Sequence, residues 1–121
     1  MLTAAIKQQI RSSFEAAKIQ LPNFSNRSSQ YKMIAEIAKT LTGEYPKSNP
    51  ILCVEAPTGI GKTMAYLIGC LPIAQANKKK LVIACANVAL QEQILYKDII
   101  EAKKYSSVEF EYALALSHIH I

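Results

Sequence analysis

The feature that most constrains this sequence is the segment Glu55-Ala-Pro-Thr-Gly-Ile-Gly-Lys-Thr63, which follows an apolar run and precedes a helical stripe. The apolar run, residues 51–54, is bounded by Pro50 and is typical of a strand buried on both faces. A helix is expected after the segment because apolar residues recur there at helical spacing: Met64, Leu67, Ile68 and Leu71. A glycine-rich turn from a strand into a helix is the setting of a phosphate-binding loop.

In such a loop, Gly59 and Gly61 would adopt backbone conformations closed to other residues, so that successive N–H groups face phosphate oxygens. Lys62 is expected to reach the β- and γ-phosphates, and the Thr63 hydroxyl to bind Mg²⁺. The standard pattern has glycine where this chain has Ala56, and the other fixed positions match. The predicted nucleotide-contacting residues of the loop are Ala56, Pro57, Thr58, Gly59, Ile60, Gly61, Lys62 and Thr63.

The other periodicities predict an α/β fold. Apolar stripes predict helices over residues 2–21, 29–42 and 90–102, and further strands are expected over 81–86 and 108–116. The helix after the loop should kink at Pro72. Strands separated by helices pair in parallel through right-handed crossovers. We therefore expect a parallel sheet with flanking helices, incomplete because it has few strands, and preceded by two N-terminal helices.

The stretch after Gly43 is rich in Gly, Pro, Ser and Asn, as connecting loops are. It divides the chain into an N-terminal helical segment, residues 1–43, and a sheet-containing domain, residues 44–121.

Composition limits the partners and the cellular location that this protein can have. Fourteen Lys and Arg against nine Asp and Glu give a net charge of +5, which permits an anionic partner, and Lys78–Lys80 is expected to be a solvated loop. Neither a membrane span nor a signal peptide is apparent, so a cytoplasmic location is expected. The odd number of cysteines fits no disulfide framework, and Cys53, Cys70 and Cys85 are expected to be buried thiols. His118 and His120 lack a third ligand for a metal.

Three motifs in the chain resemble those of one helicase group. The loop with Ala56 first resembles motif I of superfamily 2 helicases. Upstream, Arg27-Ser-Ser-Gln30 resembles their R-x-x-Q element, and downstream the stretch 86–94, Ala-Asn-Val-Ala-Leu-Gln-Glu-Gln-Ile, resembles motif Ia. Together, over about residues 1–112, the chain resembles the DinG-type, XPD-like ATP-dependent DNA helicases. The resemblance implies a RecA-like P-loop NTPase domain, of which this chain would hold the N-terminal part.

The same resemblance implies ATP and Mg²⁺ as ligands, single-stranded DNA as partner, 5′ to 3′ translocation and a link to DNA repair. It gives Lys62 and Thr63 catalytic roles and assigns Arg27 and Gln30 to the nucleotide. A Gln30 amide could pair with the adenine edge, although a solvated residue at a helix start is the alternative. Amides after a parallel strand could bond DNA phosphates, although an exposed helix face is the alternative; these are Asn87, Gln91 and Gln93.

The sequence also departs from this family. Its members have an acidic motif II, a later arginine, a second motor domain and four cysteines for an iron–sulfur cluster, and none of these is found here. The chain alone is therefore expected to bind nucleotide without turnover, with the C-terminal helicase segments missing. The alternatives are another P-loop ATPase or small kinase, and a non-catalytic nucleotide-binding fragment.

Overall fold

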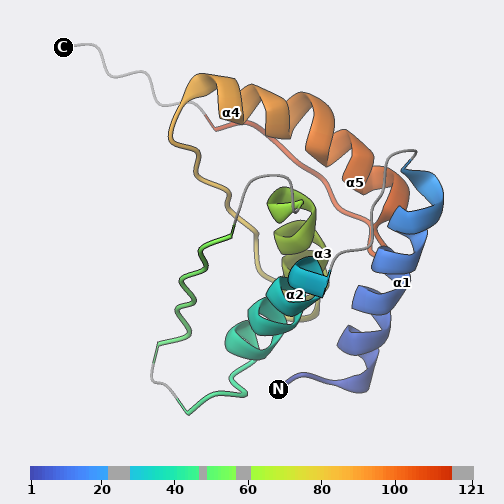
Figure 1. The fold of residues 1–121 in the computed structure, drawn as a ribbon, viewed down its shortest axis with the longest axis vertical. Helices are drawn as coiled ribbons and strands as arrows, with labels where there is room; N and C mark the ends of the chain where they lie inside the picture. Colours follow the sequence, from blue (N-terminus) through green and yellow to red (C-terminus); the bar gives the residue numbers. More distant parts are fainter. Residues whose placement is uncertain (22–27, 47–48, 57–60, 116–121) are drawn as a thin grey trace.

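The structure is a computed structural model that describes residues 1–21, 28–46, 49–56 and 61–115. Its regular elements are all helical (Figure 1): α1 (Ala4–Gln20), α2 (Ser28–Leu41), α3 (Lys62–Ala76), α4 (Val88–Gln93), the π-helical turn η1 (Ile94–Asp98) and α5 (Ile99–Tyr105). Helices α1 and α2 both pack on α3, and α1 also packs on α5. The stretch from α4 through η1 to α5 forms one continuous helical rod in Figure 1.

The N-terminal helices form where the apolar stripes predicted them. Thr3 caps α1, because its side-chain oxygen accepts a hydrogen bond of 3.2 Å from the N–H of Ile6. Helix α2 ends two residues before Gly43, which has a φ of +77°. Near this end, the Thr42 hydroxyl donates a hydrogen bond of 2.6 Å to the carbonyl of Ala38. Local capping and burial of one face therefore account for both helices.

A large apolar cluster joins these helices. Its buried members come from α1, α2, α3 and α5 and from the segment after α5: Phe14, Ala17, Ile34, Ala65, Leu67, Ile68, Leu71, Ala102, Tyr105 and Val108. A smaller cluster contains Ile6, Ala38 and Ile73. Burying one such side chain stabilises a fold by about 1.5–3 kcal/mol, so this helical core is the main stabilising feature of the described residues.

Helix α3 is the central element, and two residues shape it. A Cβ added at Gly69 would lie 3.0 Å from Cγ2 of Ile37, so the absence of a side chain there allows α2 to approach α3 closely. Pro72 lies inside α3, which continues beyond it to Ala76. The helix predicted after the loop is therefore present and runs through the proline.

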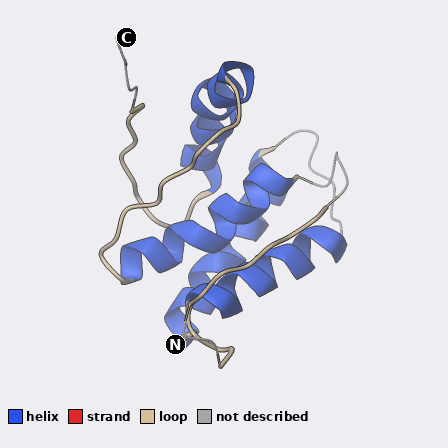
Figure 2. Cartoon of the chain, turned by 90° about the vertical axis from the view of Figure 1, so that its left-hand side faces the viewer, coloured by secondary structure: helices blue, strands red, loops and turns tan. Residues whose placement is uncertain are grey.

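The three predicted strands are absent from the described residues, as Figure 2 also shows. Residues 51–54, 81–86 and 108–115 belong to no helix or strand, and several of their apolar side chains are exposed, including Ile51 at 66% and Val82 at 83%. A strand needs a neighbour that satisfies its backbone N–H and C=O groups, and these runs do not pair with one another in the described chain. The predicted sheet and its three strands are therefore not confirmed in the described residues.

Two further predictions need correction. Cys53 is exposed, while Cys70 and Cys85 are half-buried, because the segments expected to bury Cys53 and Cys85 form no sheet. The helix predicted over residues 90–102 is longer and is interrupted by the π-helical turn η1. The predicted loop at Lys78–Lys80 is confirmed as exposed and non-helical, and Lys78 has a positive φ of 53°.

Candidate nucleotide-binding site

The start of α3 carries the described part of the phosphate-loop motif. Gly61 precedes α3 with φ 77° and ψ 47°, a left-handed conformation that favours glycine. Among the described residues no side chain caps this helix end, an arrangement that leaves its first N–H groups available to an anion. The side chain of the exposed Lys62 reaches back to Ala56, and its Nζ donates a hydrogen bond of 3.1 Å to the carbonyl of that residue. Ala56 and Lys62 thus lie at the two ends of the segment that the motif predicts to surround phosphate.

Gln30 approaches the same helix end from α2. Its side chain is almost fully buried, at 1% exposure, and its Nε2 donates a hydrogen bond of 3.2 Å to the carbonyl of Gly61. Its Oε1 is buried without a hydrogen-bond partner among the described residues. A Cβ on Gly61 would collide with Nε2 of Gln30. Gln30 is therefore not a solvated residue at a helix start.

Thr63, the predicted Mg²⁺ ligand, is half-buried in the first turn of α3. Burial raises the pKa of Tyr66, and the Thr63 hydroxyl partly offsets this rise. The hydroxyl that the motif assigns to Mg²⁺ therefore faces a tyrosine of its own helix. No group of three His, Cys, Asp or Glu side chains that could hold a metal occurs within the described residues.

The predicted DNA-contacting amides lie at α4. Asn87 caps this helix, with Oδ1 accepting a hydrogen bond of 2.8 Å from the N–H of Leu90, which leaves its amide N–H groups for other partners. Gln93 is exposed and Gln91 half-buried, and no residue of α4 is buried. The described chain thus places Asn87 at the start of α4 and Gln91 and Gln93 on a helix that has no buried residue.

One buried polar residue close to α4 was assigned no site role from the sequence. Asp98, at the end of η1, has a buried Oδ2 with no hydrogen-bond partner in the described chain. Burial raises the pKa of its carboxyl, Glu101 raises it further and Lys97 partly lowers it. Its position in an amphipathic stretch gave no signal of this burial.

Some predicted residues lie outside the described residues: Arg27, Pro57, Thr58, Gly59, Ile60, His118 and His120. The described part of the site therefore consists of Ala56, Gly61, Lys62 and Thr63 with Gln30 beside them. Of these contacts, only the one between Gln30 and the loop joins segments far apart in the sequence. No helix of the described residues combines the length and apolarity needed to cross a membrane.

Comparison with known proteins defines the class to which this arrangement belongs. The family described as "Type III restriction enzyme, res subunit" matches residues 23–115, and the chain belongs to this family. The family is part of helicase superfamily 2 and has the P-loop NTPase fold.

Among curated proteins, the chain is similar to ATP-dependent DNA helicases named DinG. It is 47% identical to the DinG protein of Photobacterium profundum over 115 residues, which are 95% of this chain and 17% of that protein. It is 50% identical over 103 residues to the DinG protein of Escherichia coli K12, covering 85% of this chain and 14% of the relative. The DinG-type resemblance inferred from the motifs is confirmed. The chain spans less than a fifth of the length of these relatives.

Proposed function

We propose that this chain forms the ATP-binding part of an ATP-dependent DNA helicase. The observation that carries the proposal is the start of α3, where left-handed Gly61 opens the helix and Lys62 turns back toward Ala56. A helix end with free N–H groups and an adjacent lysine is suited to a polyphosphate. In this proposal Ala56 to Thr63 surround the phosphates of ATP.

In this proposal, different residues bind the phosphates, bind Mg²⁺ and position the loop. When ATP is bound, the Lys62 ammonium exchanges the Ala56 carbonyl for β- and γ-phosphate oxygens. The Thr63 hydroxyl supplies an oxygen ligand of the kind that Mg²⁺ prefers. Arg27 remains assigned to the nucleotide by the R-x-x-Q resemblance alone. Gln30 holds the carbonyl of Gly61, which supports a role in positioning the loop; an adenine contact would need this buried amide to become accessible.

Single-stranded DNA is the proposed polymer partner, with Asn87, Gln91 and Gln93 as contacts. The exposure of Asn87 and Gln93 at α4, with Gln91 half-buried between them, supports this assignment, since amide groups can bond phosphates without reading bases. The translocation direction, 5′ to 3′, and the link to DNA repair come from the family. The expected α/β architecture would give the runs 51–54 and 81–86 a parallel sheet in which to pair.

Two limits on chemistry follow from the residues. The sequence contains no acidic motif II to position water, so the proposed role of this chain alone is ATP binding without turnover. Cys53, Cys70 and Cys85 do not fit an iron–sulfur cluster, because they form no group that could hold a metal within the described residues, and burial raises the pKa of Cys70 to about 11, which opposes the thiolate a cluster needs. No step is assigned to such a cluster.

Thermal unfolding with nucleotides tests the proposal. Mg²⁺–ATP should raise the melting temperature of the chain, because a ligand that binds only the folded state stabilises it by mass action. Single-stranded DNA should also bind, and binding should weaken in the Asn87→Ala/Gln91→Ala/Gln93→Ala variant while the effect of ATP persists. A melting temperature that is the same with ATP, with inorganic phosphate and without ligand would refute nucleotide binding.

A further inference from the structure

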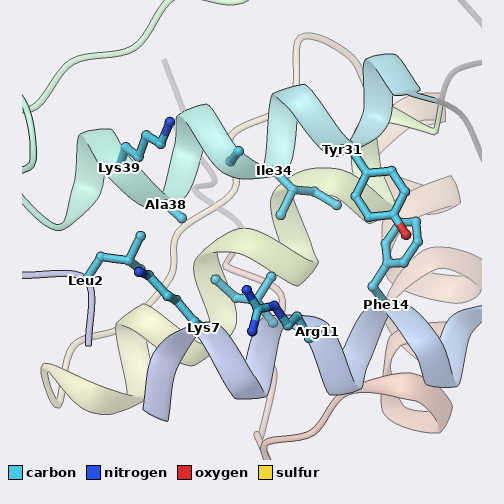
Figure 3. Close-up of a pocket in the computed structure, with 10 residues that line it drawn as sticks. Leu2, Lys7, Arg11, Phe14, Tyr31, Ile34, Ala38 and Lys39 are labelled. Atoms are coloured by element: carbon cyan, nitrogen blue, oxygen red, sulfur yellow. The ribbon is translucent and has the colours of Figure 1, made fainter. Parts of the chain in front are cut away.

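A groove between α1 and α2 lies outside the proposed nucleotide and DNA sites. It has a volume of about 270 Å³, and Figure 3 shows side chains from both helices along it. Its walls are largely aliphatic, with Ile10 from α1 and Ile34 and Ala38 from α2. At one end the rings of Phe14 and Tyr31 meet with centroids 4.1 Å apart. The groove is therefore an apolar surface with a defined aromatic end.

Positive charge borders this α1–α2 groove. The charged side chains that line it are Lys7, Arg11 and Lys39, all exposed, and no carboxylate lines it. In the described residues none of these three is within ion-pair distance of an acidic group. Glu44 lies near the other end, where its Oε1 accepts a hydrogen bond of 2.9 Å from the N–H of Leu2. The unpaired cations favour an occupant that carries negative charge beside apolar side chains.

The dimensions of the groove limit the occupant further. Its lining runs from Lys7 to Phe14 on α1 and from Tyr31 to Lys39 on α2. At ~1.5 Å per residue these spans are roughly 10–12 Å, or about two helical turns. A segment of two or three turns can therefore place aliphatic side chains along its whole length.

The same surface is poorly suited to nucleic acid. Binding of single strands relies on aromatic faces that are open to stacking bases. Phe14 is only 3% exposed; Tyr31 is 41% exposed, but its ring packs against Phe14 rather than standing open to a base. The remaining walls are aliphatic and offer a base no stacking face. An acidic peptide fits the observed combination of surfaces better than DNA does.

We propose that the α1–α2 groove is a docking site for a short acidic amphipathic helix of a partner protein. Aliphatic side chains at helical spacing enter the groove, and flanking carboxylates lie beside Lys7 and Arg11. The site does not overlap Ala56–Thr63 or α4, so docking does not require ATP or DNA.

Fluorescence anisotropy with a synthetic peptide tests this proposal on the 121-residue chain. The probe is a labelled helix of about 12 residues, with leucines at i, i+3, i+4 and i+7 and glutamates beside them. The control peptide carries lysine in place of each glutamate. The acidic peptide should bind, the basic peptide should not, and raising the salt from about 0.05 M to about 0.5 M should weaken binding.

Two variants locate the site. Lys7→Glu/Arg11→Glu should weaken binding about tenfold, whereas Lys79→Glu/Lys80→Glu, with the same change of charge on an exposed loop, should leave it nearly unchanged. Ala35→Arg places a large side chain at an exposed position of the groove and should abolish binding. Circular dichroism verifies that each variant remains folded.

The proposal is overturned if the acidic and basic peptides bind equally, or if the Lys79/Lys80 control weakens binding as much as the groove variant. It is also overturned if a single-stranded oligonucleotide, rather than the acidic peptide, binds in a manner that Ala35→Arg abolishes. That last result would identify the groove as a nucleic-acid site.

Discussion

Gln30 donates a hydrogen bond of 3.2 Å from Nε2 to the carbonyl of Gly61, joining two segments that are 31 residues apart in the sequence. Gly61 has a left-handed backbone, and a side chain on it would occupy the position of that amide nitrogen. The Gln30 amide can therefore approach the carbonyl of Gly61 only because Gly61 has no Cβ. It links α2 to Gly61, the residue that precedes α3.

Substitution of Gly61 by alanine should destabilise the chain more than the same change at Gly43. Both glycines have a φ of +77°, but a Cβ at Gly43 meets nothing within 4 Å. Gly43→Ala should therefore cost only the left-handed penalty of about 1–2 kcal/mol. Gly61→Ala should cost about 1–3 kcal/mol more, because the buried Gln30 amide must move and lose its bond.

Urea unfolding of both variants measures the difference. A double variant, Gln30→Ala/Gly61→Ala, should recover part of the additional cost because it removes the collision. Equal destabilisation by Gly61→Ala and Gly43→Ala would show that the Gln30 contact has no energetic role.

The cysteines should differ sharply in reactivity. Burial raises the pKa of Cys70 to about 11, whereas Cys53 is exposed. Because the thiolate is the reactive form, iodoacetamide at about pH 8 should label Cys53 at least ~10-fold faster than Cys70. Peptide mapping by mass spectrometry gives both rates in one experiment, and unfolding in urea should equalise them. Equal rates in the folded chain would contradict the burial of Cys70 against the core.

Asp98 should give the chain a distinctive pH dependence. Because its carboxyl pKa is raised above 3.8 by burial, the folded state binds this proton more tightly than the unfolded state does. The ionised carboxylate therefore lowers stability at neutral pH. That loss should be relieved as the pH falls through the raised pKa toward 3.8, below which both states are protonated.

Comparison of melting temperatures between pH 7 and pH 4 tests this expectation. Asp98→Asn removes the titrating group. The melting temperature of this variant minus that of the original chain should therefore be largest at pH 7 and should become smaller as the pH falls. A difference between the two proteins that does not change with pH would show that Asp98 ionises equally in the folded and unfolded states.

The sequence predicted the N-terminal helices well because each forms its own hydrogen bonds and buries its own apolar stripe. Residues 2–21 gave α1 and residues 29–42 gave α2 to within about two residues. The strand predictions for 51–54, 81–86 and 108–116 are not confirmed in the described chain, because a strand depends on a partner that periodicity does not identify. Helical periodicity likewise did not reveal the π-helical turn η1.

For the site, motif spacing was informative and long-range contact was not. The order of glycine, lysine and threonine placed Gly61, Lys62 and Thr63 at the start of a helix, as the structure has them. The burial of Gln30 depends on how α2 packs against α3, and an isolated R-x-x-Q pattern contains no information on that packing. The nucleotide and DNA roles of these residues stay predictions.

Titration of a fluorescent ATP analogue, with Mg²⁺ present, against the original chain and Lys62→Ala tests the central claim most directly. Lys62 is exposed, and its side chain bonds only the carbonyl of Ala56 among the described residues, so its removal should leave the fold intact. We predict that affinity falls by about 1.5–3 kcal/mol, or roughly 10- to 150-fold, while Lys79→Ala binds like the original chain. Equal affinity for the original chain and Lys62→Ala would contradict the assignment of this loop to ATP.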